Sequence, residues 1–97
     1  RPVRRNFRCR FGEIDLIMQD SDCLAIVEVR SRRSADFGSP ALTVDKPKQQ
    51  KIARTTLAFQ AQSVHYREWP IRFDVIAILG TDSSPGAIQW MKDAFRA

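Results

Sequence analysis

Two segments of the sequence, residues 23–30 and 71–79, are apolar on both faces when drawn as extended strands. Strands of this kind are usually covered on both sides of a sheet. The sequence between them holds one amphipathic helical pattern, and one helix covers only one face. The second face must therefore be covered by the C-terminal stretch, by residues upstream of Arg1 or by a second chain.

Two further strands are predicted ahead of residue 23. Residues 6–10 and 13–18 alternate in polarity, as half-buried strands do. Polar turns at 11–12 and 19–22 separate them from each other and from the strand at 23–30. Turns this short join antiparallel neighbours, so the first three strands are expected to form a meander.

A helix is predicted after a polar loop over residues 31–40. Asp45 is a suitable N-cap, and Pro47 suits the first turn because its missing N–H loses no hydrogen bond there. Apolar residues at helical spacing continue to about Ser63. One helix therefore connects the two strands that are apolar on both faces.

The C-terminal part has a weaker pattern. Residues 80–86 are expected to form a turn-rich loop, and the pattern over 88–95 fits either a strand or a helix. The length of 97 residues suits one domain spanning residues 1–97. No apolar run approaches the ~20 residues that span a bilayer, so no membrane-embedded segment is expected.

Positive charge is the main compositional bias. Lys and Arg total 16 against 11 Asp and Glu, which gives a net charge of +5. The charges gather in three clusters, near residues 1–10, 30–33 and 46–54. Nucleic acid is the expected partner, because each neutralised phosphate releases counterions. The alternative is a solvated basic surface. A membrane surface is disfavoured, since no segment pairs a basic face with an apolar aromatic one.

Several other chemistries lack the residues they need. Cys9 and Cys23 are too few for a disulfide framework and lack a metal-type spacing, which fits a reducing, cytoplasmic location. The lone histidine, His65, is expected at the surface. No serine has a histidine and carboxylate at a suggestive spacing, and no glycine-rich phosphate loop is present.

Acidic residues on neighbouring predicted strands suggest a metal site. Side chains alternate along a strand, so Glu13 and Asp15 share a face, as do Glu28 and Arg30. If the second and third strands pair in register, Asp15 and Glu28 lie side by side among apolar neighbours. Charges in such surroundings are usually paired or bound to metal, and Mg²⁺ accepts one or two carboxylates plus waters.

Ordinary ion pairing is the alternative for the same acids. Glu13 would then pair with Arg10, and Glu28 with Arg30 or Arg72. The strand pattern by itself does not decide between ion pairs and a metal site.

Four motifs carry a family resemblance. They are R-N-F-R-C-R-F-G-E-I-D-L-I over residues 5–17, L-A-I-V-E-V-R-S-R over 24–32, F-G at 37–38 with K-Q at 48–49, and R-F-D-V over 72–75. Together they resemble the signature of the YraN-like family, a bacterial family with a predicted nuclease fold. The resemblance extends from about Arg5 to Phe95.

The family is similar in turn to archaeal Holliday-junction resolvases and other PD-(D/E)xK nucleases. The resemblance implies an α/β fold, a restriction-endonuclease-like α/β/α core around a mixed sheet. It also implies an N-terminal helix bearing a glutamate. No segment of this sequence matches that helix, so we expect it to be absent from this chain.

The resemblance also implies site residues. Asp15, Glu28 and the carbonyl of Val29 would bind Mg²⁺ or Mn²⁺, with Glu13 as a supporting ligand. Arg30 occupies the lysine position of the motif, and because a guanidinium stays protonated it is expected to act electrostatically. Gln49 would orient a water or a phosphate. The residues expected to contact nucleic acid are Arg5, Arg8, Arg10, Arg32, Arg33, Lys48 and Lys51.

The resulting hypothesis is a metal-dependent endonuclease that hydrolyses DNA, including branched DNA. Cutting a junction symmetrically needs two active sites, so a homodimer is expected with that activity. An arginine at position 30 and the unmatched glutamate helix motivate an alternative, a non-catalytic nucleic-acid-binding module with the same fold. A third hypothesis is an interaction domain for an acidic protein.

Overall fold

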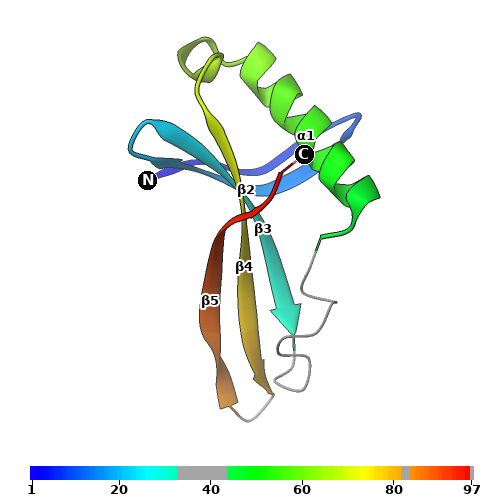
Figure 1. Cartoon of the computed structure of the whole chain (residues 1–97), viewed down its shortest axis with the longest axis vertical. Coiled ribbons are helices and arrows are strands. Elements are labelled where there is room, and N and C mark those ends of the chain that lie inside the picture. The colour runs from blue at the N-terminus through cyan, green and yellow to red at the C-terminus, as the bar shows by residue number, and fades with distance from the viewer. Residues whose placement is uncertain (33–43, 82–83, 97) are drawn as a thin grey trace.

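The five strands form one mixed sheet in the order β1-β2-β3-β4-β5 (Figure 1). The computed structural model describes residues 1–32, 44–81 and 84–96. Strands β3 and β4 run parallel, and the other neighbouring pairs run antiparallel. The elements are β1 (Pro2–Cys9), β2 (Gly12–Asp20), β3 (Cys23–Arg32), α1 (Lys46–Ala61), the 3₁₀ helix η3 (Val64–Tyr66), β4 (Ile71–Thr81) and β5 (Ser84–Phe95).

The predicted meander is confirmed, because β1, β2 and β3 are successive antiparallel neighbours. The predicted start of the first strand at Asn6 is wrong, since β1 begins at Pro2. Arginines at alternate and adjacent positions hide the strand pattern there. The part of the predicted loop at 33–40 lies outside the described residues.

The last two strands form a longer hairpin than predicted. The loop expected over 80–86 is wrong in extent, because β4 continues to Thr81 and β5 begins at Ser84. The open choice for 88–95 resolves as strand. Pro85 suggested a loop, yet β5 is an edge strand, where a missing N–H need not interrupt pairing.

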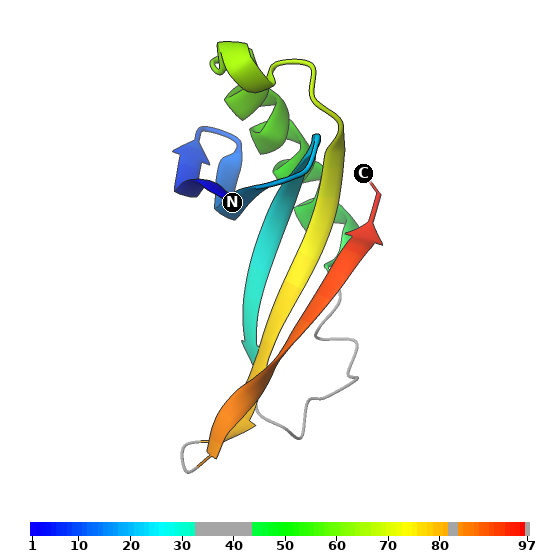
Figure 2. The ribbon, with the colours of Figure 1, turned by 90° about the vertical axis from the view of Figure 1, so that its left-hand side faces the viewer.

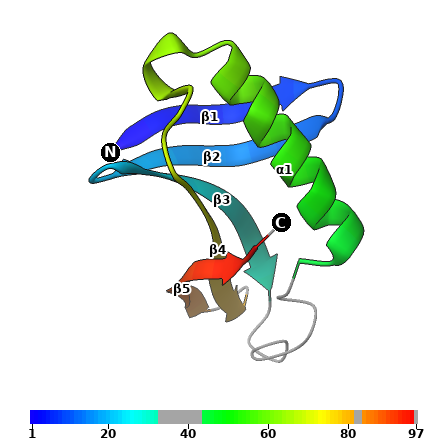
Figure 3. The same cartoon turned by 45° about the horizontal axis from the view of Figure 1, so that its top comes forward.

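Helix α1 covers one face of the sheet, as predicted, and lies across β1 and β2 (Figure 3). Asp45 is its N-cap, and Asp45 Oδ1 accepts a hydrogen bond from the Lys48 backbone N–H at 2.9 Å. The buried side chains of Ile52 and Phe59 pack onto the sheet, and the Phe59 ring meets Phe7 edge to face at 5.4 Å. This contact joins α1 to the edge strand β1.

The opposite face of the sheet keeps apolar side chains in solvent. Four of them are substantially exposed: Val29, Ile78, Ile88 and Trp90. Figure 2 shows β4 and β5 extending beyond α1 as a two-stranded arm. Within residues 1–32, 44–81 and 84–96, α1 is the only α-helix, and it is too short and polar to cross a bilayer. The α/β class and the mixed sheet are confirmed.

The two edges of the sheet differ in charge. Strand β1 exposes the side chains of Arg4, Arg5 and Arg8. Residues 87–91 of β5 carry no charge, and Ile88 and Trp90 within them are 70% and 43% exposed.

Candidate metal centre

Strands β2 and β3 stop pairing at the predicted acidic positions. Their ladder ends with Leu16 opposite Val27. One residue further on, Asp15 Oδ2 accepts a hydrogen bond from the Val29 backbone N–H at 2.9 Å. A side-chain carboxylate therefore takes the place of a backbone acceptor and is fixed against the segment of β3 that carries Glu28.

Glu28 is a buried carboxylate with nearby charges of both signs. Its residue is 8% exposed. Burial raises the pKa of Glu28, and the negative charge of Asp15 adds to that rise. The Lys48 ammonium lies 3.1 Å from Glu28 Oε1 and, together with the charge of Arg30, opposes the rise. The charges on Lys48 and Arg30 thus offset part of the cost of burying Glu28 near Asp15.

The oxygen atoms carried by these facing segments are of the type that binds a small divalent cation. They comprise the carboxylates of Asp15 and Glu28 and the nearby Val29 backbone. Mg²⁺ is bound by oxygen ligands and keeps several of its waters, so two carboxylates suffice. No group of three or more His, Cys, Asp and Glu side chains converges within the part of the chain that the structure describes. A site of the expected kind would therefore retain water ligands.

Asp15 also faces a hollow on the side of the sheet away from α1. The hollow has a volume of about 700 Å³. Its lining includes Arg5 from β1, Asp15 and Leu16 from β2, and Val29 and Ile78 from the parallel pair β3–β4. The hollow is therefore lined by one basic residue, Arg5, and one acidic residue, Asp15.

Comparison with known proteins identifies the family. Residues 1–78 match the model of "Uncharacterised protein family UPF0102". A UPF0102 protein of Saccharophagus degradans is 46% identical over 94 residues, which are 97% of this chain and 75% of that protein. A UPF0102 protein of Pseudomonas putida is 40% identical over 93 residues, 96% of this chain and 75% of its own length. The chain belongs to the UPF0102 family. The YraN-like resemblance is thereby confirmed.

Glu13, one of the predicted site residues, is paired with a neighbouring arginine in this UPF0102 protein. Glu13 forms an ion pair with the Arg8 Nε, its cross-strand neighbour. The alternative pairing of Glu13 with Arg10 is wrong, because the Arg10 guanidinium lies 4.8 Å from the centre of the Phe11 ring. That ion pair uses Oε2 of Glu13, and the expected role of Glu13 as a supporting ligand stays a prediction.

Gln49 also has a local partner. Its Nε2 donates to the Val44 carbonyl at 2.7 Å, which holds the residue in the first turn of α1. The amide oxygen is the part that can accept a hydrogen bond from a water. The structure thus leaves the expected role of Gln49 as a prediction.

The predicted nucleic-acid contacts of UPF0102 lie on β1, β3 and α1. Arg5 and Lys51 are exposed, and neither has an ion-pair partner among the described residues. Arg8 pairs with Glu13 and Lys48 with Glu28. Arg32 ends β3, and Arg33 lies outside the described residues.

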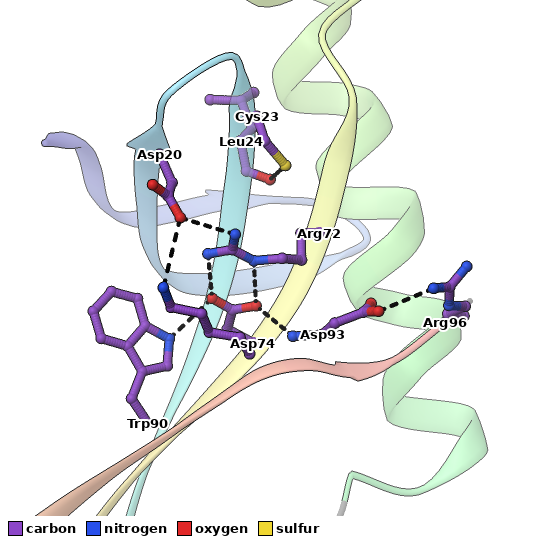
Figure 4. Close-up of polar contacts among 9 residues, drawn as sticks. Asp20, Cys23, Leu24, Arg72, Asp74, Trp90, Asp93 and Arg96 are labelled. Carbon is purple, nitrogen blue, oxygen red and sulfur yellow. Dashed lines mark hydrogen bonds and ion pairs between the residues drawn. The ribbon is translucent and has the colours of Figure 1, made fainter.

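A second polar cluster lies on the sheet face away from α1 (Figure 4). Asp74 is fully buried and accepts four hydrogen bonds, each of 2.9 Å, from Arg72 Nε, a second Arg72 nitrogen, Trp90 Nε1 and the Asp93 backbone N–H. Burial alone would raise the pKa of Asp74, but these donors lower it below its ordinary value. Arg72 also pairs with Asp20.

This cluster assigns Asp74 a structural role. Its carboxylate accepts from Arg72 on its own strand and from the backbone of Asp93, and so holds β4 and β5 together. The pairing of Glu28 with Arg30 or Arg72 is wrong as the main ion pair, because Lys48 contacts Glu28 and Arg72 contacts Asp20 and Asp74.

The sequence did not reveal Lys48 as the partner of Glu28. The N-cap at Asp45 places Lys48 in the first turn of α1, yet nothing in the pattern says where that turn lies relative to β3. Asp20 and Trp90 were likewise missed as members of the Asp74 cluster, because their contacts join strands far apart in sequence.

Proposed function

We propose that this UPF0102 protein is a metal-dependent endonuclease that hydrolyses phosphodiester bonds in DNA, including branched DNA. The observation that supports the proposal is that Asp15 and Glu28 lie on facing segments of β2 and β3 just beyond the end of their ladder, where Asp15 accepts a hydrogen bond from the Val29 backbone N–H. A negative charge near the buried carboxylate of Glu28 is costly unless a cation offsets it. The net charge of +5 favours a polyanionic substrate.

The residues of the chain have separate roles in this mechanism. Asp15 and Glu28 would hold Mg²⁺ or Mn²⁺, with the Val29 carbonyl as a further oxygen donor. The cation, when bound, supplies Lewis acidity that activates water and offsets charge on the phosphate. Arg30 stabilises the negative charge that develops on the phosphate, since a guanidinium cannot act as a base. Gln49 orients a water, whose O–H donates to the amide oxygen of the side chain.

The test is cleavage of labelled four-way, flap and linear DNA with Mg²⁺ or Mn²⁺. The parent protein should cut at least one substrate, and Asp15→Asn should reduce the rate at least 100-fold. Asp22→Asn is the matched control, because Asp22 lies exposed in the β2–β3 turn and loses the same charge. Equal cleavage by the parent and Asp15→Asn would rule the proposal out.

A non-catalytic nucleic-acid-binding module is the second candidate. The observation in its favour is that the Lys48 ammonium lies 3.1 Å from Glu28 Oε1 and supplies a counter-charge to the buried carboxylate. This module would bind DNA with an affinity that falls steeply with salt, without Mg²⁺, and equally well after Glu28→Gln. Strict dependence of binding on metal would contradict it.

Two accompanying proposals concern the setting of the activity. Paired cuts in a junction call for a homodimer, which light scattering of the purified protein would detect. A cytoplasmic location fits Cys9 and Cys23, which are both free thiols.

A further inference from the structure

Lys48 contacts the more buried acid of the candidate metal centre. Its Nζ lies 3.1 Å from Glu28 Oε1, and the side chains are 47% and 10% exposed. The acid is therefore enclosed, whereas the ammonium reaches it from solvent along a flexible stem. This difference in exposure allows the Lys48 ammonium to move away while the Glu28 carboxylate stays in place.

The helix start holds Lys48 at this position. Asp45 Oδ1 accepts from the Lys48 backbone N–H at 2.9 Å, and Gln49 Nε2 donates to the Val44 carbonyl at 2.7 Å. Both hydrogen bonds tie the first turn of α1 to the residues just before it. The backbone of Lys48 is thus fixed, and only its side chain has freedom to move.

The buried carboxylate of Glu28 needs a positive charge close to it. Glu28 is buried and lies near the negative charge of Asp15, while the charge of Arg30 contributes at longer range. An uncompensated buried carboxylate is strongly destabilising. The ammonium of Lys48 therefore does in this structure what a divalent cation would do when bound.

We propose that Lys48 is a resident counter-ion of the metal centre, occupying the cation position beside Glu28 until a divalent ion displaces it. The inference rests on the proposed function in one respect, the binding of a divalent ion by Asp15 and Glu28. Displacement frees a half-exposed ammonium next to the site, where it can contact a DNA phosphate. Lys48 would therefore link metal binding to substrate binding.

The test compares Mn²⁺ affinities by calorimetry, without DNA, for the parent, Lys48→Gln and Lys51→Gln. Lys51 is the matched control, since it lies on the same helix, is exposed and removes the same charge. Lys48→Gln removes the competing ammonium and should bind Mn²⁺ about fivefold more tightly than Lys51→Gln, the effect expected from losing one partly exposed ion pair. Equal or weaker binding by Lys48→Gln overturns the inference.

A second measurement covers the case in which Lys48→Gln does not fold. Nitrogen-15 NMR of lysine ammonium groups in the parent should show the Lys48 signal shifting and exchanging faster with water as Mg²⁺ is added. An unchanged Lys48 signal at saturating Mg²⁺ overturns the inference and leaves the proposed function standing. Binding by Lys48→Gln alone supports the inference, and no binding by any variant overturns both proposals.

Discussion

The carboxylate of Asp15 accepts a hydrogen bond from the backbone N–H of Val29 at 2.9 Å, just beyond the last backbone pair of β2 and β3. This contact fixes a charged side chain at the point where two strands separate. It gives Asp15 a role in joining the strands, beside the role of metal ligand that we propose for it. Substitutions can separate these roles.

Asp15→Asn should keep the strand contact and lose the metal. The amide oxygen of asparagine can still accept from Val29, so the free energy of unfolding should change little. Asp15→Ala removes the acceptor and should lower the free energy of unfolding by about 1 kcal/mol. Urea denaturation measures the free energy of unfolding, and Mn²⁺ calorimetry measures the affinity for the metal. Undiminished Mn²⁺ binding by Asp15→Asn would refute the assignment.

Arg30 should matter through its charge alone. Arg30→Lys keeps the positive charge and should retain most of the cleavage rate, whereas Arg30→Gln should lose about 100-fold, as for one transition-state donor. Single-turnover cleavage at several pH values provides the measurement. Circular dichroism of both variants controls for folding. If Arg30→Gln cleaved as fast as the parent, the electrostatic role would be wrong.

DNA affinity should depend on salt through specific basic residues. Arg5→Ala and Lys51→Ala should each reduce the slope of log K against log salt by about 0.9, the value for one phosphate contact. Arg8→Ala should reduce it less, because Glu13 already offsets that charge. Fluorescence anisotropy from low to moderate salt measures the slope. Arg67→Ala is the control. If it reduced the salt slope as much as Arg5→Ala does, the attraction to DNA would be non-specific.

Asp74 should make the fold sensitive to acid. Its pKa is lowered in the folded protein, so its stabilisation is fully present above the unfolded value of about 3.9 and is lost as the pH falls through the folded pKa. Asp74→Asn leaves Arg72 without its buried partner and should cost about 3 kcal/mol at neutral pH. Thermal melts between pH 2 and pH 7 should show a smaller loss in acid for this variant.

The control for Asp74 is Asp22→Asn in the exposed β2–β3 turn, which should leave the melting curves almost unchanged. A pH dependence that is the same in Asp74→Asn and the parent would show that other acids govern acid unfolding.

Gly12 should resist substitution because it begins β2 in a conformation that side chains disfavour. Its φ is +152°, and an added Cβ would lie 3.3 Å from Thr55 Oγ1 on α1. Gly12→Ala should therefore lower the free energy of unfolding by about 1 to 2 kcal/mol through strain and displacement of α1. Denaturant titration measures it, with Ala58→Gly as a helix control expected to cost about 1 kcal/mol. A neutral Gly12→Ala would show that the turn can relax.

Local patterns predicted the main elements of this fold. The meander, the helix after Asp45 and the strand from residue 71 follow from alternation, capping and apolar periodicity. The ends of β1, β4 and β5 did not follow, because arginines, glycine and proline obscure a strand whose pairing partner is set elsewhere in the chain. Tertiary pairing determined those boundaries.

The candidate site was predictable only in part. Alternation and register suggested that Asp15 and Glu28 would lie side by side, and the structure places them on facing segments of β2 and β3. The partner of Glu28 was not predictable, because it depends on how α1 crosses the sheet. The same holds for Asp20 and Trp90, which meet Arg72 and Asp74 only in the folded chain.

The unequal edges of the sheet limit how copies of the chain can associate through their strands. Two copies that paired β1 with β1 would set arginines against arginines, which opposes that pairing. The segment 87–91 of β5 carries no such charge. The arginines of β1 therefore protect one border of the sheet against pairing with its own kind.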